Sequence, residues 1–117
     1  MEIITGMAKD DYFVIVYKIL AYLYVQLKNG EDIDLDMIRA DGNLFKINDR
    51  YYSYIISNLV NDGYIVGPQF KTWGGETIID IRECQITPKG IEYIFENSLF
   101  EKAKKFLKDV KEITPFI

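Results

Sequence analysis

The stretch that decides the fold runs from Asn58 to Gly90 and reads NLVNDGYIVGPQFKTWGGETIIDIRECQITPKG. Asp62-Gly63 ends a helical segment, and the β-branched and aromatic residues 64–66 then predict a strand. Gly74-Gly75 predicts a tight turn, and residues 77–81 supply the strand that returns from it and pairs with the first one. The middle of the chain is therefore expected to form a β-hairpin directly after a helix.

Two further features of this stretch bound the hairpin. Gly67-Pro68 interrupts the first strand, so we expect an edge position or a bend there rather than an uninterrupted ladder. Thr87 is suited to cap a helix and Pro88 to open it, because the donor that proline lacks would be unpaired at that position anyway. The helix that begins there is expected to run to about Asn97.

The first part of the chain predicts a largely apolar helix over residues 10–28. Asp10 or Asp11 is suited to its start, and Asn29-Gly30 to its stop. Its nearly uncharged run is shorter than the roughly 18 residues that a membrane span needs, so we expect it to be buried in a core or against another chain. Residues 1–9 are an N-terminal extension without an assigned role.

Two shorter helices should follow. Asp34 is suited to cap a second helix that turns Leu35 and Ile38 inward, and Gly42 would permit a left-handed exit from it. Asn48 is suited to cap a third helix. Helical spacing places four of its apolar residues on one face, toward the core: Tyr52, Ile55, Ile56 and Leu59. The opposite face presents mostly polar side chains, with Tyr51 at its flank: Arg50, Ser53, Tyr54, Ser57, Asn58 and Asn61.

Residues 99–117 predict a final amphipathic helix with Ser98 as its cap. We expect its apolar stripe to pack on the domain of residues 10–98 or on a partner subunit. Five lysines lie outside that stripe, at positions typical of a solvated face: Lys102, Lys104, Lys105, Lys108 and Lys111.

The composition makes an enzyme or a metal protein unexpected. The chain has no histidine, so the usual general base and most zinc sites are missing, and we expect no catalytic residue, metal or cofactor. Its one cysteine, Cys84, has no partner for an internal disulfide and is interpreted as a small core residue. Because the first residues also lack the pattern of a secretory signal, we expect a cytoplasmic protein.

Three helices, a hairpin and further C-terminal helices are the order of elements in a winged-helix domain. The expected fold is thus α+β, a winged helix with a three-helix core and a β-hairpin wing, plus C-terminal helices. Two runs carry a resemblance beyond that architecture, namely LVNDGYIVG at residues 59–67 and IRECQITPKGIEYI at residues 81–94, followed by the lysine-rich tail. Together they resemble the YjcQ-like family of small bacterial and phage winged-helix proteins. The resemblance implies this fold and a prokaryotic or prophage context, and carries over no functional residue.

Function is predicted from the third helix and the wing. Arg50 is suited to a phosphate or a guanine edge, Asn58 and Asn61 to adenine, and the remaining polar residues of that face, Ser53, Tyr54 and Ser57, to phosphates. On the wing, Lys71 and Trp73 are suited to a minor groove or to stacking on a base. The leading hypothesis is therefore a non-enzymatic regulator of bacterial or prophage origin that binds double-stranded DNA. We expect it to bind as a dimer, because the first helix carries more aromatic residues than one small core would hide, namely Tyr12, Tyr17, Tyr22 and Tyr24.

Charge and aromatic content favour an alternative. The chain carries a net charge of −4, and residues 31–62 hold seven acids against three cations, whereas a DNA-binding surface is normally basic. Trp73 is equally suited to pack back onto the domain or to anchor a subunit contact. The alternative is a protein-interaction module that dimerises through the aromatic first helix or the C-terminal helix and keeps the winged-helix fold without binding DNA.

Overall fold

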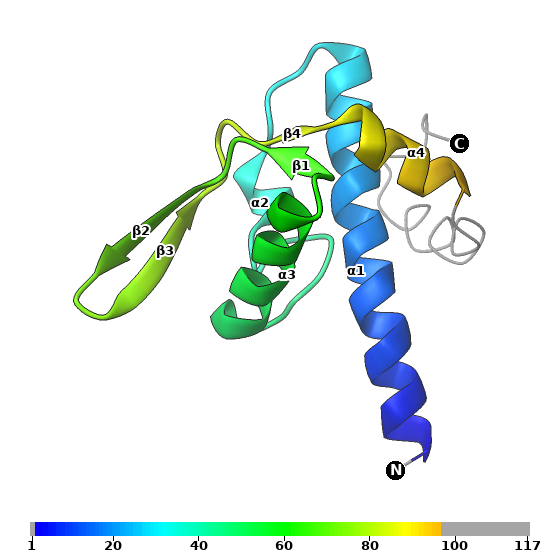
Figure 1. Ribbon diagram of the computed structural model, residues 1–117, viewed down its shortest axis with the longest axis vertical. Helices are drawn as coiled ribbons and strands as arrows, with labels where there is room; N and C mark the ends of the chain where they lie inside the picture. Colours follow the sequence, from blue (N-terminus) through cyan, green and yellow to red (C-terminus); the bar gives the residue numbers. More distant parts are fainter. Residues whose placement is uncertain (1, 97–117) are drawn as a thin grey trace.

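The computed structural model describes residues 2–96 of the chain, with side chains from Tyr12 onward. Within that range the protein is α+β, with four helices and two small antiparallel sheets of two strands each (Figure 1). The long helix α1 runs the length of the molecule, α2 and α3 lie on one side of it, and α4 lies on the other (Figure 1). The predicted helix over residues 99–117 lies outside the described residues.

Helix α1 spans Glu2–Asn29 and begins earlier than the sequence suggests. The predicted start at Asp10 or Asp11 is wrong, because residues 2–9 contain no proline and continue the helix into those positions. The predicted stop is confirmed. Gly30 adopts a φ of 68°, Glu31 N donates to Gln26 O at 2.9 Å, and Gly30 N donates to Leu27 O at 3.2 Å. This pair of bonds is a Schellman motif, which satisfies carbonyls at the end of the helix.

The apolar middle of α1 is the centre of the core. Between Val14 and Val25 nearly every side chain is buried, which confirms the expectation of a buried helix. Lys18 is the single charged residue of this segment, and its Nζ donates to the carbonyl of Leu44 at 2.8 Å. The helix packs against α3, α4 and β4, so three other elements share it as their support.

Helix α2 is a single turn, Leu35–Ile38, capped by Asp34 as predicted, with Asp36 N donating to Asp34 Oδ1 at 2.9 Å. Ile38 is buried as expected, but the prediction for Leu35 is wrong. One turn can direct only part of its residues to the core, and here Met37 takes the second inward position while Leu35 stays 39% exposed.

Gly42 does not provide a left-handed exit from α2, because its φ is not positive. It is required by close packing instead. A Cβ atom at Gly42 would lie 2.8 Å from the carbonyl oxygens of both Asp36 and Met37, which is too close for any side chain.

Helix α3 spans Asp49–Asn61 and matches its prediction closely. Asn48 is the cap, since Tyr51 N donates to Asn48 Oδ1 at 2.8 Å. The four residues expected in the core are all buried: Tyr52, Ile55, Ile56 and Leu59. The hydroxyl of Tyr52 donates to Ile38 O at 2.9 Å and ties α3 to α2.

The strands pair differently from the prediction. Strand β1, Ile65–Val66, pairs with β4, Gln85–Ile86, while β2, Gln69–Trp73, pairs with β3, Glu76–Asp80. The expected pairing of residues 64–66 with residues 77–81 is therefore wrong. The interruption at Gly67-Pro68 is confirmed, because Gly67 has a φ of 106° and the strand breaks there into β1 and β2.

Helix α4, Pro88–Glu96, begins where the sequence predicts. Gly90 N donates to Thr87 Oγ1 at 3.1 Å, which makes Thr87 the cap. The same hydroxyl donates to Gly63 O at 2.6 Å and so fixes the start of α4 to the end of α3. The expected last residue of this helix, Asn97, lies outside the described residues.

Candidate interaction site on the third helix and the hairpin

The β2–β3 hairpin is closed by the two glycines that the sequence singles out. Gly74 and Gly75 have φ angles of 60° and 85°, the signs that a type I′ turn requires at both central positions. The pair Trp73 and Glu76 flanks the turn, and the register then continues without a bulge to the pair Gln69 and Asp80. Trp73 is therefore fixed at the outer end of the hairpin.

Side chains of the hairpin fall on two faces, because residues along a strand alternate and paired residues share a face. One face carries residues from both strands: Gln69, Lys71, Trp73, Glu76, Ile78 and Asp80. The other carries Phe70, Thr72, Thr77 and Ile79. Each face thus combines polar groups with large apolar side chains.

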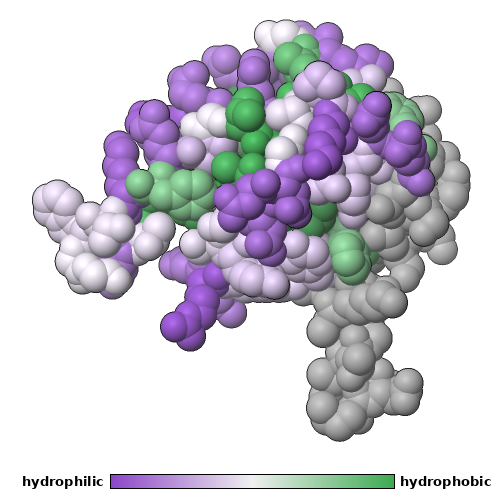
Figure 2. Space-filling model, in the orientation of Figure 1, coloured by the Kyte–Doolittle hydropathy of each residue, from purple (hydrophilic) through white to green (hydrophobic). Residues whose placement is uncertain are grey.

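The apolar side chains of the hairpin are unusually exposed. Trp73 is 80% exposed, Ile78 54% and Phe70 41%, and only Ile79, near the base, packs against the core. Figure 1 shows the hairpin standing clear of α1 and α3, and Figure 2 shows it projecting from the body, with pale and green atoms along it. The interpretation that Trp73 folds back onto the domain is therefore wrong.

The base of the hairpin is braced by an ion pair. Arg82 Nε and Nη2 donate to Asp80 Oδ1 and Oδ2 at 3.0 and 2.7 Å. These hydrogen bonds from Arg82 hold the pKa of Asp80 well below its usual range, and the same pair raises the pKa of Arg82. Both groups stay charged at neutral pH, so Arg82 is engaged within the chain.

Only part of the polar face of α3 is exposed to solvent. Arg50, Tyr54 and Asn61 are exposed, while Ser53, Ser57 and Asn58 are half-buried. Lys71 and Trp73 lie on β2, away from this helix (Figure 1). The eight predicted residues therefore form two separate groups rather than one surface.

Tyr12 of α1 is a contact that the sequence did not predict. Asn58 Nδ2 donates to the hydroxyl of Tyr12 at 3.1 Å, and the rings of Tyr12 and Tyr54 lie 6.2 Å apart. Asn58 is thus committed to holding α3 against α1, although the helical pattern placed it on the polar face. Tyr12 comes at the polar end of an apolar segment, and this position is the signal that it could pair with a polar group.

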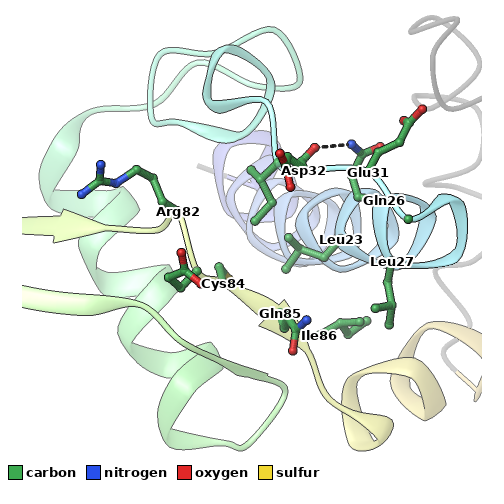
Figure 3. Close-up of a pocket in the computed structure, with 12 residues that line it drawn as sticks. Leu23, Gln26, Leu27, Glu31, Asp32, Arg82, Cys84, Gln85 and Ile86 are labelled. Carbon is green, nitrogen blue, oxygen red and sulfur yellow. Dashed lines mark hydrogen bonds between the residues drawn. The ribbon is translucent and has the colours of Figure 1, made fainter.

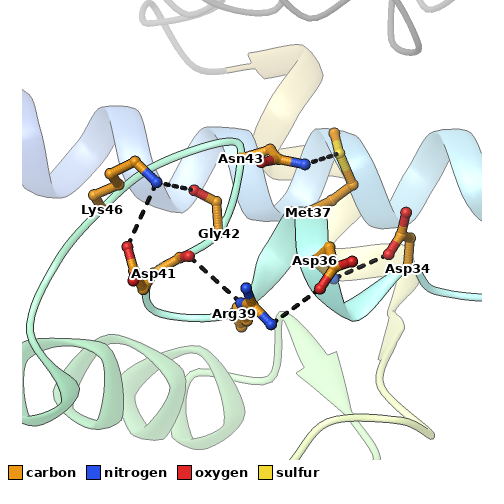
Figure 4. Close-up of polar contacts among 8 residues, drawn as sticks. All are labelled: Asp34, Asp36, Met37, Arg39, Asp41, Gly42, Asn43 and Lys46. Atoms are coloured by element: carbon orange, nitrogen blue, oxygen red, sulfur yellow. Dashed lines mark hydrogen bonds and ion pairs between the residues drawn. The ribbon is translucent and has the colours of Figure 1, made fainter.

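Residues 30–48 join α1 to α3, include the single turn of α2 and lie next to α3 (Figure 4). We call this segment the acidic loop, because its acids outnumber its two cations. Its two cations are held by its own carboxylates, with Arg39 Nη1 2.9 Å from Asp36 Oδ1 and Lys46 Nζ 3.5 Å from Asp41 Oδ1. Lys46 also donates to Gly42 O at 3.3 Å. These pairs leave little positive charge for a ligand in this loop.

Two classes of site receive no support within residues 2–96. In that range no cluster of three or more Cys, Asp or Glu side chains is arranged to hold a metal ion, and no helix has the length and apolar character of a membrane span. Cys84 is buried as predicted, and burial raises the pKa of its thiol to about 12. The thiol is therefore protonated at neutral pH and is a poor nucleophile.

The comparisons with known proteins identify a family. No curated protein and no solved structure matches the chain. The family model described as YjcQ protein matches residues 17–113, which is most of the sequence and includes α3, the hairpin and α4. The match agrees with the resemblance of the motifs around the hairpin. The chain therefore belongs to the YjcQ family.

Proposed function

We propose that this YjcQ-family chain is a non-enzymatic protein-interaction domain that associates with a second copy of itself through the β2–β3 hairpin. Its scaffold is that of a winged helix. The succession of α1, α2 and α3 with a hairpin after α3 supports this assignment, as does the start of α4 behind the hairpin. The hairpin occupies the place of the wing.

The observation that carries the proposal is the exposure of Trp73, Ile78 and Phe70 on a hairpin that projects from the body. An isolated two-stranded hairpin is marginally stable in water, so packing on a further surface would stabilise such a pair of strands. Burying a side chain as large as tryptophan removes about 150–250 Å² from water, at about 25 cal/mol per Å². Trp is accordingly favoured at the centre of interfaces.

A second copy is a suitable partner for this hairpin. Each of its two strands has one open edge, because β2 and β3 pair only with each other among the described strands. Two such edges can pair around a two-fold axis, which is the commonest symmetry of soluble oligomers. The aromatic residues of α1 supply less surface for a dimer, since Tyr17 and Tyr22 are buried within their own chain.

Trp73 is the sole tryptophan of the chain, and its fluorescence therefore reports on the hairpin alone. We expect its emission to shift to shorter wavelength as protein concentration rises, in step with a doubling of the mass measured by light scattering. Trp73→Ala should keep the mass of one chain over the same range. The matched control is Leu35→Ala, which removes an exposed apolar side chain from α2 and should dimerise normally. A wild-type mass of one chain at high concentration would contradict the proposal.

Binding to double-stranded DNA, in a regulatory role of bacterial or prophage origin, is the second candidate function. It is favoured by the exposure of Arg50 on α3, together with Tyr54 and Asn61, at the position of a recognition helix. Lys71 on the hairpin adds a second cation. The paired cations of the acidic loop count against it, because phosphate neutralisation supplies most non-specific affinity for DNA.

Fluorescence anisotropy with a labelled duplex tests this candidate. At about 50 mM salt the DNA hypothesis requires measurable affinity that falls steeply as salt is added. Arg50→Ala should weaken it, whereas Lys28→Ala, which removes an equal charge near the end of α1, should not. The absence of binding at low salt would eliminate this candidate and leave the hairpin proposal untouched.

A further inference from the structure

Strand β4 has an edge that faces away from β1. Thr87 N donates to Tyr64 O at 3.0 Å, so Thr87 and Tyr64 form a hydrogen-bonded pair at the end of the β1–β4 ladder. Because such pairs alternate along an antiparallel ladder, the N–H and C=O of Ile86 point to the opposite edge. Within residues 2–96, β4 pairs with β1 alone, and that second edge is not part of a sheet.

A cavity of about 440 Å³ lies along this edge (Figure 3). Five consecutive residues line it, from the turn at Arg82 through Ile86 of β4. The facing wall is formed by residues 30–33, and Leu23 and Leu27 of α1 line the floor. Its volume falls within the range of about 300–1,000 Å³ that is usual for ligand sites. We call this cavity the β4-edge slot.

The facing wall does not close the slot. Gln26 Nε2 donates to Asp32 O at 2.6 Å and Gln26 O accepts from Glu31 N at 2.9 Å, so α1 holds this segment from below. Residues 31–34 have no regular secondary structure, and Asp34 is extended, with φ −92° and ψ 109°. The slot therefore lies between an unpaired strand edge and a segment without regular secondary structure, and no strand of the described residues fills it.

The chemistry of the slot selects its occupant. Its rim carries three exposed acids, Glu31, Asp32 and Glu83, while the one cation, Arg82, is bound by Asp80. Its floor is apolar, and Leu27 is 48% exposed there. The negatively charged rim attracts lysine and arginine side chains, and the apolar floor accepts aliphatic side chains.

We propose that the β4-edge slot binds an extended segment of a partner protein in which apolar and basic residues alternate. The segment adds to β4 as a strand, with its backbone bonded to the N–H and C=O of Ile86. Alternate side chains then point to opposite sides, the apolar ones toward Leu27 and the basic ones toward Glu31, Asp32 and Glu83. No residue of α3, β2 or β3 lines the slot, so this surface is distinct from the proposed hairpin contact.

The test uses the full-length chain labelled with ¹⁵N and a blocked hexapeptide of alternating valine and lysine. We expect saturable shifts of the amide signals of residues 30–33 and 84–86, and slower hydrogen exchange at the Ile86 N–H. A peptide with glutamate in place of lysine should bind at least about fivefold more weakly, and one with alternate N-methylated residues should not bind, because it cannot pair with a strand edge. Binding of all three peptides alike would overturn the proposal.

Variants of the protein make the test specific to the slot. Asp32→Lys should weaken the valine-lysine peptide by about fivefold, the effect of one charge contact of modest strength. Glu92→Lys makes the same charge change at an exposed position on α4 and should bind normally. Trp73→Ala should also bind normally, which separates this proposal from the hairpin dimer. Either a free chain whose Ile86 N–H is already protected by its own residues, or an equal loss in both lysine variants, would overturn the proposal.

Discussion

Cys84 lies in the core beside β4, and its burial links the stability of the fold to pH. The thiol has a pKa of about 12 in the folded chain, against about 8.5 for an unfolded cysteine. Between these values the folded state keeps a proton that the unfolded state loses, so the free energy of unfolding falls as pH rises above about 8.5. The same burial that makes the thiol unreactive therefore costs stability in alkaline solution.

Urea unfolding at several values between pH 8 and pH 10 measures this effect. We expect the wild-type free energy of unfolding to decline with a slope that includes up to about 1.4 kcal/mol per pH unit from Cys84, and Cys84→Ala to lack that part. Burial also raises the pKa of Tyr52, but from 10.0, so that tyrosine contributes above this range. Equal slopes in wild type and variant would show that burial does not keep the thiol of Cys84 protonated in this pH range.

Gly42 shows that the type of a residue does not by itself reveal why the fold requires it. A glycine after a short helix is typical of a left-handed exit, and that interpretation is wrong here because the requirement is space. The carbonyls of Asp36 and Met37 approach Gly42 only because the loop folds back on α2, with Asn43 N donating to Asp36 O at 2.8 Å. Such an approach depends on the path of the loop and leaves no local mark in the sequence.

At the scale of elements, Thr87 joins three of them. It caps α4 through Gly90, its hydroxyl bonds Gly63 at the end of α3, and its backbone N–H bonds Tyr64 at the start of β1. A residue chosen for a local cap thus also fixes how two helices meet.

Thr87→Ala should destabilise the fold by about 1–2 kcal/mol, because the cap and the bond to Gly63 are lost together. Thr87→Ser keeps the hydroxyl and should cost only a fraction of that. Thermal unfolding of the two variants, followed by far-ultraviolet circular dichroism, makes the comparison. If serine and alanine lowered the melting temperature equally, the hydroxyl would not be the group that matters.

The caps of the helices could be predicted from the sequence, whereas the pairing of the strands could not. The caps Asp34, Asn48 and Thr87 fall where predicted, because each acts on backbone groups within three residues. Strand pairing depends on distant residues, and the choice of β4 over residues 77–81 as the partner of β1 follows from the backbone break at Gly67-Pro68. Periodicity alone does not encode that choice.

At the scale of the molecule, α1 is the common support of α3, α4 and β4. Leu20 sits at its middle and is fully buried, whereas Leu27, two turns on, is 48% exposed. Leu20→Ala should cost about 2–5 kcal/mol, the usual range for a buried leucine, and Leu27→Ala well under that. Chemical denaturation measures both. Comparable losses would mean that the end of α1 is covered to the same degree as its middle.

The hairpin surface is local in sequence, whereas the surroundings of the α3 face and the β4-edge slot bring together segments far apart in the chain. Asn58 meets Tyr12 across 46 residues, and the β4-edge slot joins residues 30–33 to residues 82–86. The sequence supplied the residue types for the α3 face and the hairpin, including the exposed Trp73, but not which of them would be occupied by internal contacts. No feature of the sequence predicted the slot, because an open strand edge is a property of the assembled fold.

The break at Gly67-Pro68 separates the ladder that closes the core from the ladder that carries Trp73. Substitutions at the exposed outer positions of β2 and β3, away from Ile79 and Asp80, therefore do not alter contacts of the β1–β4 pairing or of the core. The outer part of the hairpin can in this way be exchanged, and with it the surface offered to a partner, while the interior stays the same.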